Sequence, residues 1–210
     1  MDKATILEAI RQNAQDACQP SPKLYLLSID LDNYYLRYNA RNEIKKLAQE
    51  VDGFLGIARQ FFNVVHVWHD SPNLDMDRLQ LNLRTPKQRK GSLIVADEKD
   101  YSFMFPYTPP VAGEAILSKE FDSAFFATEL ENFMPKQDSI VLALGTSRKI
   151  CITSSLIGGI NCGYNMAAVT DLIYPPIPTE TCTEPSELGG APVITSHEIL
   201  EALCIDNELN

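Results

Sequence analysis

Short, continuous apolar runs alternate along this chain with longer segments of helical periodicity. Six runs predict buried strands, which begin near Leu24, Val64, Ala115, Ile140, Asn165 and Val193. Apolar residues at helical spacing predict helices over 3–17, 42–62, 125–134, 147–161 and 196–204. Because strands that alternate with helices form βαβ units, this order predicts an α/β fold: a three-layer α/β/α sandwich around a mostly parallel, six-stranded sheet.

The length and composition fit one globular domain. The chain has 210 residues, of which 45% are hydrophobic and 22% are charged, which argues against a mainly disordered chain, a collagen-like chain or a coiled coil. It contains no repeat and no clear linker. We therefore predict an N-terminal helical extension over 1–22 and a single domain over 23–210.

The charge distribution limits the partners. The net charge is −10, and residues 150–210 carry eight acids and no Lys or Arg, which disfavours nucleic acid or an anionic membrane as the partner. One basic run, 84–90, is interpreted as a solvated loop in preference to a phosphate site. The chain shows no signal peptide, no run long enough to span a membrane, and an odd number of cysteines without a CxxC motif. We expect a cytoplasmic protein that needs no cofactor and no metal.

Chemically active side chains lie at the ends of three predicted strands. Asp30 follows the first strand, Lys119 ends the third, and Cys151 lies in the first turns of the helix after the fourth. The carboxyl ends of parallel strands meet at one edge of a sheet, where ligands bind in such folds. A helix N-terminus and an ammonium group both lower the pKa of a thiol, and a carboxylate can accept the thiol proton and return it. The pattern is compatible with a nucleophilic hydrolase, but a buried structural cysteine and a capping aspartate are the commoner explanation of such spacing.

Longer motifs narrow this choice. The segment Lys119-Glu-Phe-Asp-Ser-Ala-Phe125-Phe-Ala-Thr-Glu-Leu130 resembles the K-x-x-x-S-A-F-x-x-T-x-L signature of the isochorismatase-like cysteine hydrolases. Gly145 and Cys151 stand six residues apart, as in the G-x-x-T-x-x-C segment of that family. Residues 29–33 resemble its I-D-x-Q-N segment, and residues 192–200 resemble its last strand and helix. The resemblance covers about residues 24–204.

The resemblance implies an Asp-Lys-Cys triad on a three-layer fold. Asp30 would be the proton acceptor and donor, Lys119 would orient the Asp and hold the thiolate, and Cys151 would be the nucleophile. It also implies a cis peptide bond at Thr146–Ser147 and an oxyanion hole formed by the backbone N–H groups of Ser147 and Cys151. Since members cleave amide-like bonds in small molecules, the implied function is hydrolysis of an amide-like C–N bond of a small-molecule substrate through an acyl-enzyme on Cys151.

Departures from the family pattern leave an alternative open. Asp32 stands where Gln is usual, and Arg148 and Lys149 occupy positions before Cys151 that are usually Thr and small or acidic residues. The two basic residues either steer an anionic substrate or are simply exposed on the first turn. The alternative is a non-catalytic isochorismatase-like protein that binds a small molecule or a protein partner.

The pocket itself is less well defined by the sequence. The candidate pocket residues are Tyr35, Trp68, Phe125 and Arg148, although ordinary core packing explains Tyr35 and Trp68 at least as well. The long irregular segment 70–113 is expected to cover the site, and aromatic residues alternate at 101–107, as expected for a pocket wall, a subunit contact or plain core. We expect a homo-oligomer. Because His66 and His69 lie three apart on a predicted strand, they point to opposite faces and should not chelate a metal.

Overall fold

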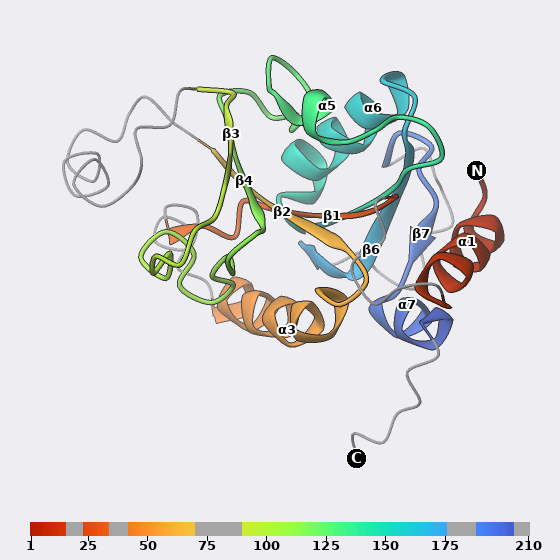
Figure 1. Ribbon diagram of the computed structural model, residues 1–210, viewed down its shortest axis with the longest axis horizontal. Coiled ribbons are helices and arrows are strands. Elements are labelled where there is room, and N and C mark those ends of the chain that lie inside the picture. The colour runs from red at the N-terminus through yellow and green to blue at the C-terminus, as the bar shows by residue number, and fades with distance from the viewer. Residues whose placement is uncertain (16–22, 34–41, 70–89, 176–187, 204–210) are drawn as a thin grey trace.

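The computed structural model describes residues 1–15, 23–33, 42–69, 90–175 and 188–203 (Figure 1). The candidate pocket residue Tyr35, the basic run as far as Arg89 and the first twenty residues of the segment 70–113 lie outside these ranges.

A seven-stranded sheet forms the centre of the fold, with strand order β3-β4-β2-β1-β5-β6-β7. Its strands are β1 (Leu24–Ile29), β2 (Asn63–His69), β3 (Leu93–Val95), β4 (Ala115–Lys119), β5 (Ile140–Thr146), β6 (Asn165–Tyr174) and β7 (Val193–Ile194). All neighbours pair in parallel except β3, which runs antiparallel to β4 at one edge. The prediction of a mostly parallel sheet and the starts of its six parallel strands are confirmed.

The predicted count of six strands is wrong, because β3 was missed. Its three residues are half-buried or exposed and lie in the polar, proline-bearing segment after β2. An edge strand of this length is covered on few sides, so it carries no long apolar run for a sequence pattern to reveal.

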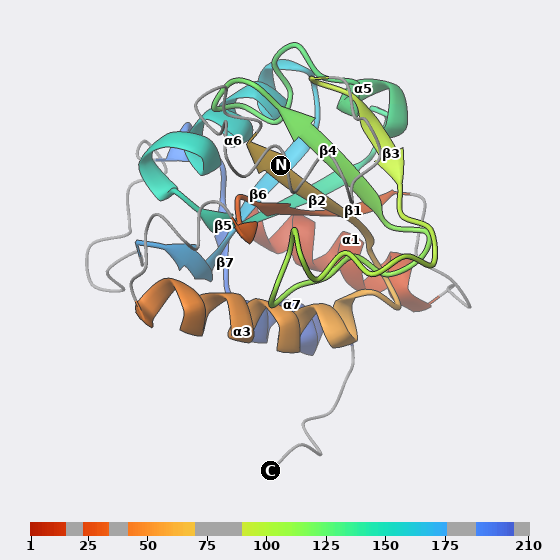
Figure 2. The same ribbon diagram turned by 90° about the vertical axis from the view of Figure 1, so that its left-hand side faces the viewer.

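Helices cover both faces of the sheet (Figures 1 and 2). On one face lie α1 (Lys3–Gln15), α3 (Asn42–Ala58) and α7 (Ser196–Ala202), and on the other lie α5 (Leu130–Phe133), a π-helical turn η1 (Arg148–Ile152) and α6 (Thr153–Asn161). The predicted three-layer α/β/α arrangement is therefore confirmed.

Two predicted helices differ from the observed ones. The helix expected over 125–134 is reduced to α5, because Ala127 adopts a φ of 55° that an α-helix cannot contain. The helix expected from residue 147 begins as η1 and becomes α-helical at Thr153. The last helix, α7, has Thr195 as its N-cap, which forms a capping box with Glu198.

The core has two large layers, one on each side of the sheet. Leu24 and Leu26 of β1 pack towards α3, whereas Leu27 and Ile29 pack towards α6. Because both faces are covered, the strands read as continuous apolar runs in the sequence. The N-terminal helix α1 contributes fully buried side chains to the layer shared with α3 and α7, and the division of the chain at residue 22 stays a prediction.

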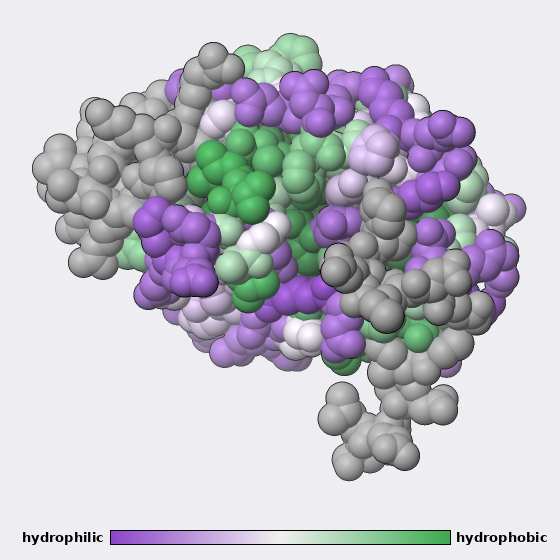
Figure 3. All heavy atoms as spheres, in the orientation of Figure 1, coloured by the Kyte–Doolittle hydropathy of each residue, from purple (hydrophilic) through white to green (hydrophobic). Residues whose placement is uncertain are grey.

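A smaller third cluster lies under the aromatic segment 101–105. Tyr101, Met104 and Phe105 are buried there with Ile116 of β4, and Trp68 packs against them. Figure 3 shows an apolar area over β3 and β4 that is bordered by polar side chains. Among the described helices, none combines the length and apolar character that crossing a membrane requires.

Candidate active site

Asp30 lies directly after β1 and is held by the two neighbouring strands. Asp30 is 1% exposed, and its backbone has a φ of 53°. The Asp30 N–H donates to the carbonyl of Val67 at 2.8 Å, and the Thr146 hydroxyl donates to the Asp30 carbonyl at 3.0 Å. Aspartate tolerates this left-handed conformation better than most residues, and the two hydrogen bonds fix it.

Gly145 allows β5 to approach the end of β1. It pairs with Ile29 and has a φ of 111°. A Cβ atom added at this position would lie 2.1 Å from the carbonyl oxygen of Ile29, so no other residue fits without moving the backbone. The next peptide bond, Thr146–Ser147, is cis, as the family resemblance implied.

Lys119 forms a buried ion pair with Asp30. The Lys119 side chain is fully buried, and its Nζ donates to Asp30 Oδ2 at 3.0 Å and to the carbonyl of Asp122 at 3.3 Å. Burial alone would lower the pKa of Lys119, but the Asp30 carboxylate and Cys151 outweigh that effect and raise it. Within the described residues Asp30 Oδ1 accepts no hydrogen bond. The ammonium therefore holds one carboxylate oxygen and leaves the other able to receive a proton.

Cys151 lies in η1, close enough to Asp30 and Lys119 for both to shift its ionisation. The residue is 7% exposed. Burial raises its pKa to about 12, the Asp30 carboxylate adds to that shift, and Lys119 opposes it. The expectation of a lowered thiol pKa is therefore wrong, because loss of hydration and the neighbouring Asp30 carboxylate outweigh the Lys119 ammonium. At neutral pH the resting side chain is a thiol, and its proton must be removed when it attacks.

The backbone at the start of η1 is arranged around the Ser147 carbonyl. That carbonyl accepts hydrogen bonds from the N–H groups of Ile150 and Ile152, both at 3.1 Å. The Cys151 N–H lies between these two donors in the sequence. That the Cys151 N–H and the Ser147 N–H together form an oxyanion hole stays a prediction.

Three of the four candidate pocket residues lie within the described part of the chain. Trp68 is half-buried and packs against the aromatic cluster at 101–105. Phe125 is 5% exposed, packs on the glycines of α6 and lies 5.3 Å from the ring of Tyr164, in the same apolar cluster as Cys151. Arg148 is half-buried as the first residue of η1, and Lys149 beside it is exposed. Their roles towards a substrate stay predictions.

Hydrogen bonds of Asn33 and Thr146 near Asp30 were not predicted from the sequence. The Asn33 N–H donates to the carbonyl of Met104 at 2.6 Å, and its side-chain amide donates to the carbonyl of Phe103 at 3.0 Å. The segment 101–105 therefore lies against the loop that follows Asp30, and its role in covering the site stays a prediction. The second contact is the hydrogen bond from the Thr146 hydroxyl to the Asp30 carbonyl; Thr146 stands at an unspecified position of the G-x-x-T-x-x-C pattern, so no motif signalled it.

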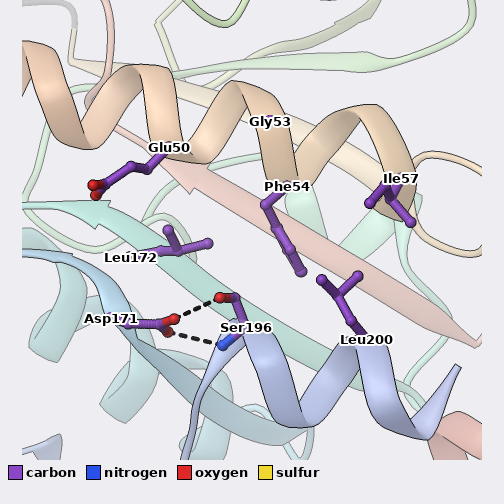
Figure 4. Close-up of a pocket in the computed structure, with 8 residues that line it drawn as sticks. All are labelled: Glu50, Gly53, Phe54, Ile57, Asp171, Leu172, Ser196 and Leu200. Atoms are coloured by element: carbon purple, nitrogen blue, oxygen red, sulfur yellow. Dashed lines mark hydrogen bonds between the residues drawn. The ribbon is translucent and has the colours of Figure 1, made fainter. Parts of the chain in front are cut away.

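A hollow of about 550 Å³ lies elsewhere, between α3, β6 and α7 (Figure 4). Phe54, Leu172 and Leu200 project towards it, and Asp171 accepts a hydrogen bond from the Ser196 N–H at the start of α7. Phe54 and Leu172 belong to the α3 layer of the core and Leu200 packs against it, whereas Cys151 belongs to the α6 layer. The hollow and the triad therefore occupy different faces of the sheet.

Fold and site together define an α/β protein whose parallel sheet brings a carboxylate, an ammonium and a thiol to one edge. The family described as the Isochorismatase domain matches residues 25–187, which is most of the chain. The chain belongs to the isochorismatase family of hydrolases.

Individual relatives share either a short stretch of sequence or low sequence identity with this chain. A maleamate amidohydrolase of Pseudomonas putida is 39% identical over 66 residues, a stretch that spans only 30% of each chain. The structure of an N-carbamoylsarcosine amidase from Thermoplasma acidophilum is 20% identical, with a TM-score of 0.61, and the match covers 83% of this chain and 96% of that one. An isochorismatase family protein from Desulfovibrio vulgaris is also 20% identical, with a TM-score of 0.58 over 87% and 98% of the two chains. At these identities, the structural likenesses show the shared fold.

Proposed function

We propose that this protein is a cysteine-dependent amidohydrolase that cleaves an amide-like C–N bond of a small molecule. The single observation that carries the proposal is the buried ion pair between Lys119 Nζ and Asp30 Oδ2, at 3.0 Å, beside the Cys151 thiol. Burying two charges costs free energy of desolvation that their attraction often fails to recover, so a contribution to stability alone does not explain the pair. Two relatives with amidase names, the maleamate amidohydrolase and the N-carbamoylsarcosine amidase, support the same reaction class.

The geometry supports a two-step reaction. Asp30 takes the proton from Cys151 as its Sγ attacks the substrate carbonyl carbon, and Lys119 keeps the carboxylate oriented. The C–N bond then breaks as Asp30 gives that proton to the departing nitrogen. Water attacks the resulting thioester, Asp30 accepts a proton from it, and the proton returns to the sulfur as the C–S bond breaks and a carboxylic acid leaves.

The raised pKa of the Cys151 thiol fits a mechanism in which Asp30 removes the thiol proton only while the sulfur attacks the substrate. A thiol with a pKa of about 12 is not ionised in the resting protein, so proton transfer and attack must be coupled. The backbone N–H groups of Ser147 and Cys151 would stabilise the oxyanion that forms in each step. Trp68 and Arg148 are proposed to contact the substrate, and a homo-oligomer stays part of the proposal.

A substrate screen tests this function. Purified protein is assayed for ammonia or amine release from nicotinamide, ureides, carbamoyl amino acids, maleamate and N-carbamoylsarcosine. We expect turnover of at least one compound, its loss in Cys151→Ala, and its retention in the matched control Cys162→Ala, whose thiol donates to Glu131 instead. Unchanged turnover in Cys151→Ala would sink the mechanism, and no turnover by the wild type would favour the binding-protein alternative.

A further inference from the structure

A second buried polar cluster lies outside the site formed by Asp30, Lys119 and Cys151. Glu114 directly precedes β4, the strand that ends in Lys119, and its side chain is 9% exposed. Arg59 Nε lies 2.9 Å from Glu114 Oε1, and His66 Nε2 lies 2.9 Å from Glu114 Oε2. One carboxylate therefore joins the end of α3, the middle of β2 and the start of β4.

The charges in this cluster compensate one another. Burial lowers the pKa of the fully buried His66, and the contact with Glu114 only partly offsets this, so its ring is a neutral donor at neutral pH. Burial would raise the pKa of Glu114, but the hydrogen bonds and charges of His66 and Arg59 outweigh it and hold that pKa below its ordinary value. Glu114 is therefore a buried carboxylate paired with the Arg59 guanidinium, which is favourable only while the geometry is kept.

The cluster also holds the segment 96–114 in place. The Val111 N–H donates to Glu114 Oε2 at 2.9 Å, and Arg59 Nη2 donates to the carbonyl of Pro109 at 3.0 Å. The Ala96 N–H donates to the Glu114 carbonyl at 2.7 Å, which closes the segment at its base. The Phe105 ring lies 5.3 Å from the ring of His66. The segment has little regular structure, so these contacts fix its position.

The far end of this segment reaches the loop after Asp30. The carbonyls of Phe103 and Met104 accept both hydrogen bonds from Asn33, at 3.0 and 2.6 Å. Asn33 is only three residues beyond Asp30, whose left-handed backbone depends on its surroundings. A shift of the segment would therefore act on the chain that carries the Asp30 carboxylate.

We propose that Glu114 is a positioning residue for Asp30. Together with Arg59 and His66 it holds the segment 101–105 against Asn33, and Asn33 keeps the Asp30 carboxylate beside Lys119. This proposal rests on the proposed function, because it assigns Glu114 a role in the reaction that Asp30 would perform. Small displacements of a proton-transfer group cost far more in rate than in substrate binding, so the effect should fall on kcat.

The test compares Glu114→Gln with the control Glu198→Gln, which also replaces an ion-paired glutamate by glutamine. Glu198→Gln removes a carboxylate that pairs with Lys3 and caps α7, remote from the loop after Asp30. For Glu114→Gln we expect kcat to fall by roughly tenfold to a hundredfold with KM changed less than about threefold, and for Glu198→Gln we expect both to stay within about twofold. Equal losses in the two variants, or an unchanged kcat in Glu114→Gln, would overturn the proposal.

A second readout needs no substrate. The rate of iodoacetamide labelling of Cys151 is followed against pH by peptide mass spectrometry, with Cys162 as the reference thiol in the same chain. Because the Asp30 carboxylate raises the pKa of Cys151, its displacement should move the labelling midpoint of Cys151 to lower pH, in the same direction as Asp30→Asn, while Cys162 keeps its midpoint. An unchanged Cys151 midpoint in folded Glu114→Gln means that Glu114 is only structural.

These two readouts separate failure of the proposal from failure of the proposed function. A wild type without turnover refutes the function, and the labelling midpoint still decides whether Glu114 positions Asp30. If Glu114→Gln does not fold, Arg59→Lys, which keeps the positive charge beside Glu114 but loses the forked geometry, takes its place with the same expected directions.

Discussion

The Cys151 thiol makes the stability of the folded chain depend on pH in alkaline solution. Folding raises its pKa from an ordinary value of 9.0 to about 12. Between these values the unfolded chain releases the thiol proton and the folded chain keeps it, so the unfolded state gains relative stability as pH rises. Since one unit of pKa corresponds to about 1.4 kcal/mol, Cys151 should lower the free energy of unfolding by about 1.4 kcal/mol at pH 10 and by less than about 0.1 kcal/mol at pH 8.

Urea unfolding of the wild type and of Cys151→Ala at pH 8 and pH 10 measures this effect. Ionisable groups that do not contact Cys151 contribute equally to both proteins, so the difference between the two reports Cys151 together with its coupling to Asp30 and Lys119. We expect the wild type to lose about 1.4 kcal/mol more than the variant between the two pH values.

The sign of the difference decides the state of the resting nucleophile. If Cys151 were a stabilised thiolate, its folded pKa would lie below 9.0, and the wild type would gain stability relative to the variant over the same pH interval. A gain, or parallel behaviour of the two proteins, would refute the conclusion that burial and Asp30 dominate the ionisation of this thiol.

Three further predictions concern the base, the approach of two strands and the assembly. Asp30→Asn should reduce turnover by at least about a hundredfold and leave a thioester detectable by intact-mass spectrometry, and wild-type turnover in this variant would exclude Asp30 as the base. Gly145→Ala should lower the free energy of unfolding by roughly 3 kcal/mol or more, because its Cβ would meet the Ile29 carbonyl. The control Gly163→Ala also has a positive φ, but its Cβ would enter open space, so it should lower the free energy of unfolding clearly less. Equal urea midpoints for the two variants would contradict the clash. Light scattering after size exclusion should give a multiple of 23.5 kDa, and a mass of 23.5 kDa would rule out the expected homo-oligomer.

The candidate site was partly readable from the sequence. Asp30, Lys119 and Cys151 follow or end apolar runs, and parallel strands bring such positions to one edge whatever the details of packing. The cis bond at Thr146–Ser147 was implied by the family resemblance, and the structure has it. By contrast, the pocket could not be defined, because Phe125 has the same apolar character whether it packs in the core or lines a site.

The layer arrangement and the positions of the parallel strands along the chain follow from the sequence pattern alone. Continuous apolar runs require a sheet covered on both faces, and alternation with helices requires parallel connections, so local pattern and global fold agree. That is why the starts of β1, β4 and β5 were placed correctly.

The ionisation of Cys151 and the contacts around Asp30 arise from tertiary packing. A pKa depends on hydration and on charges brought close by folding, and the balance between burial, Asp30 and Lys119 has no signature in spacing. The same holds for Glu114, which contacts Arg59 and His66 across 55 and 48 residues of sequence. These long-range contacts exist because the sheet order places β2 between β1 and β4, and it is the packed sheet, not any local motif, that sets their distances.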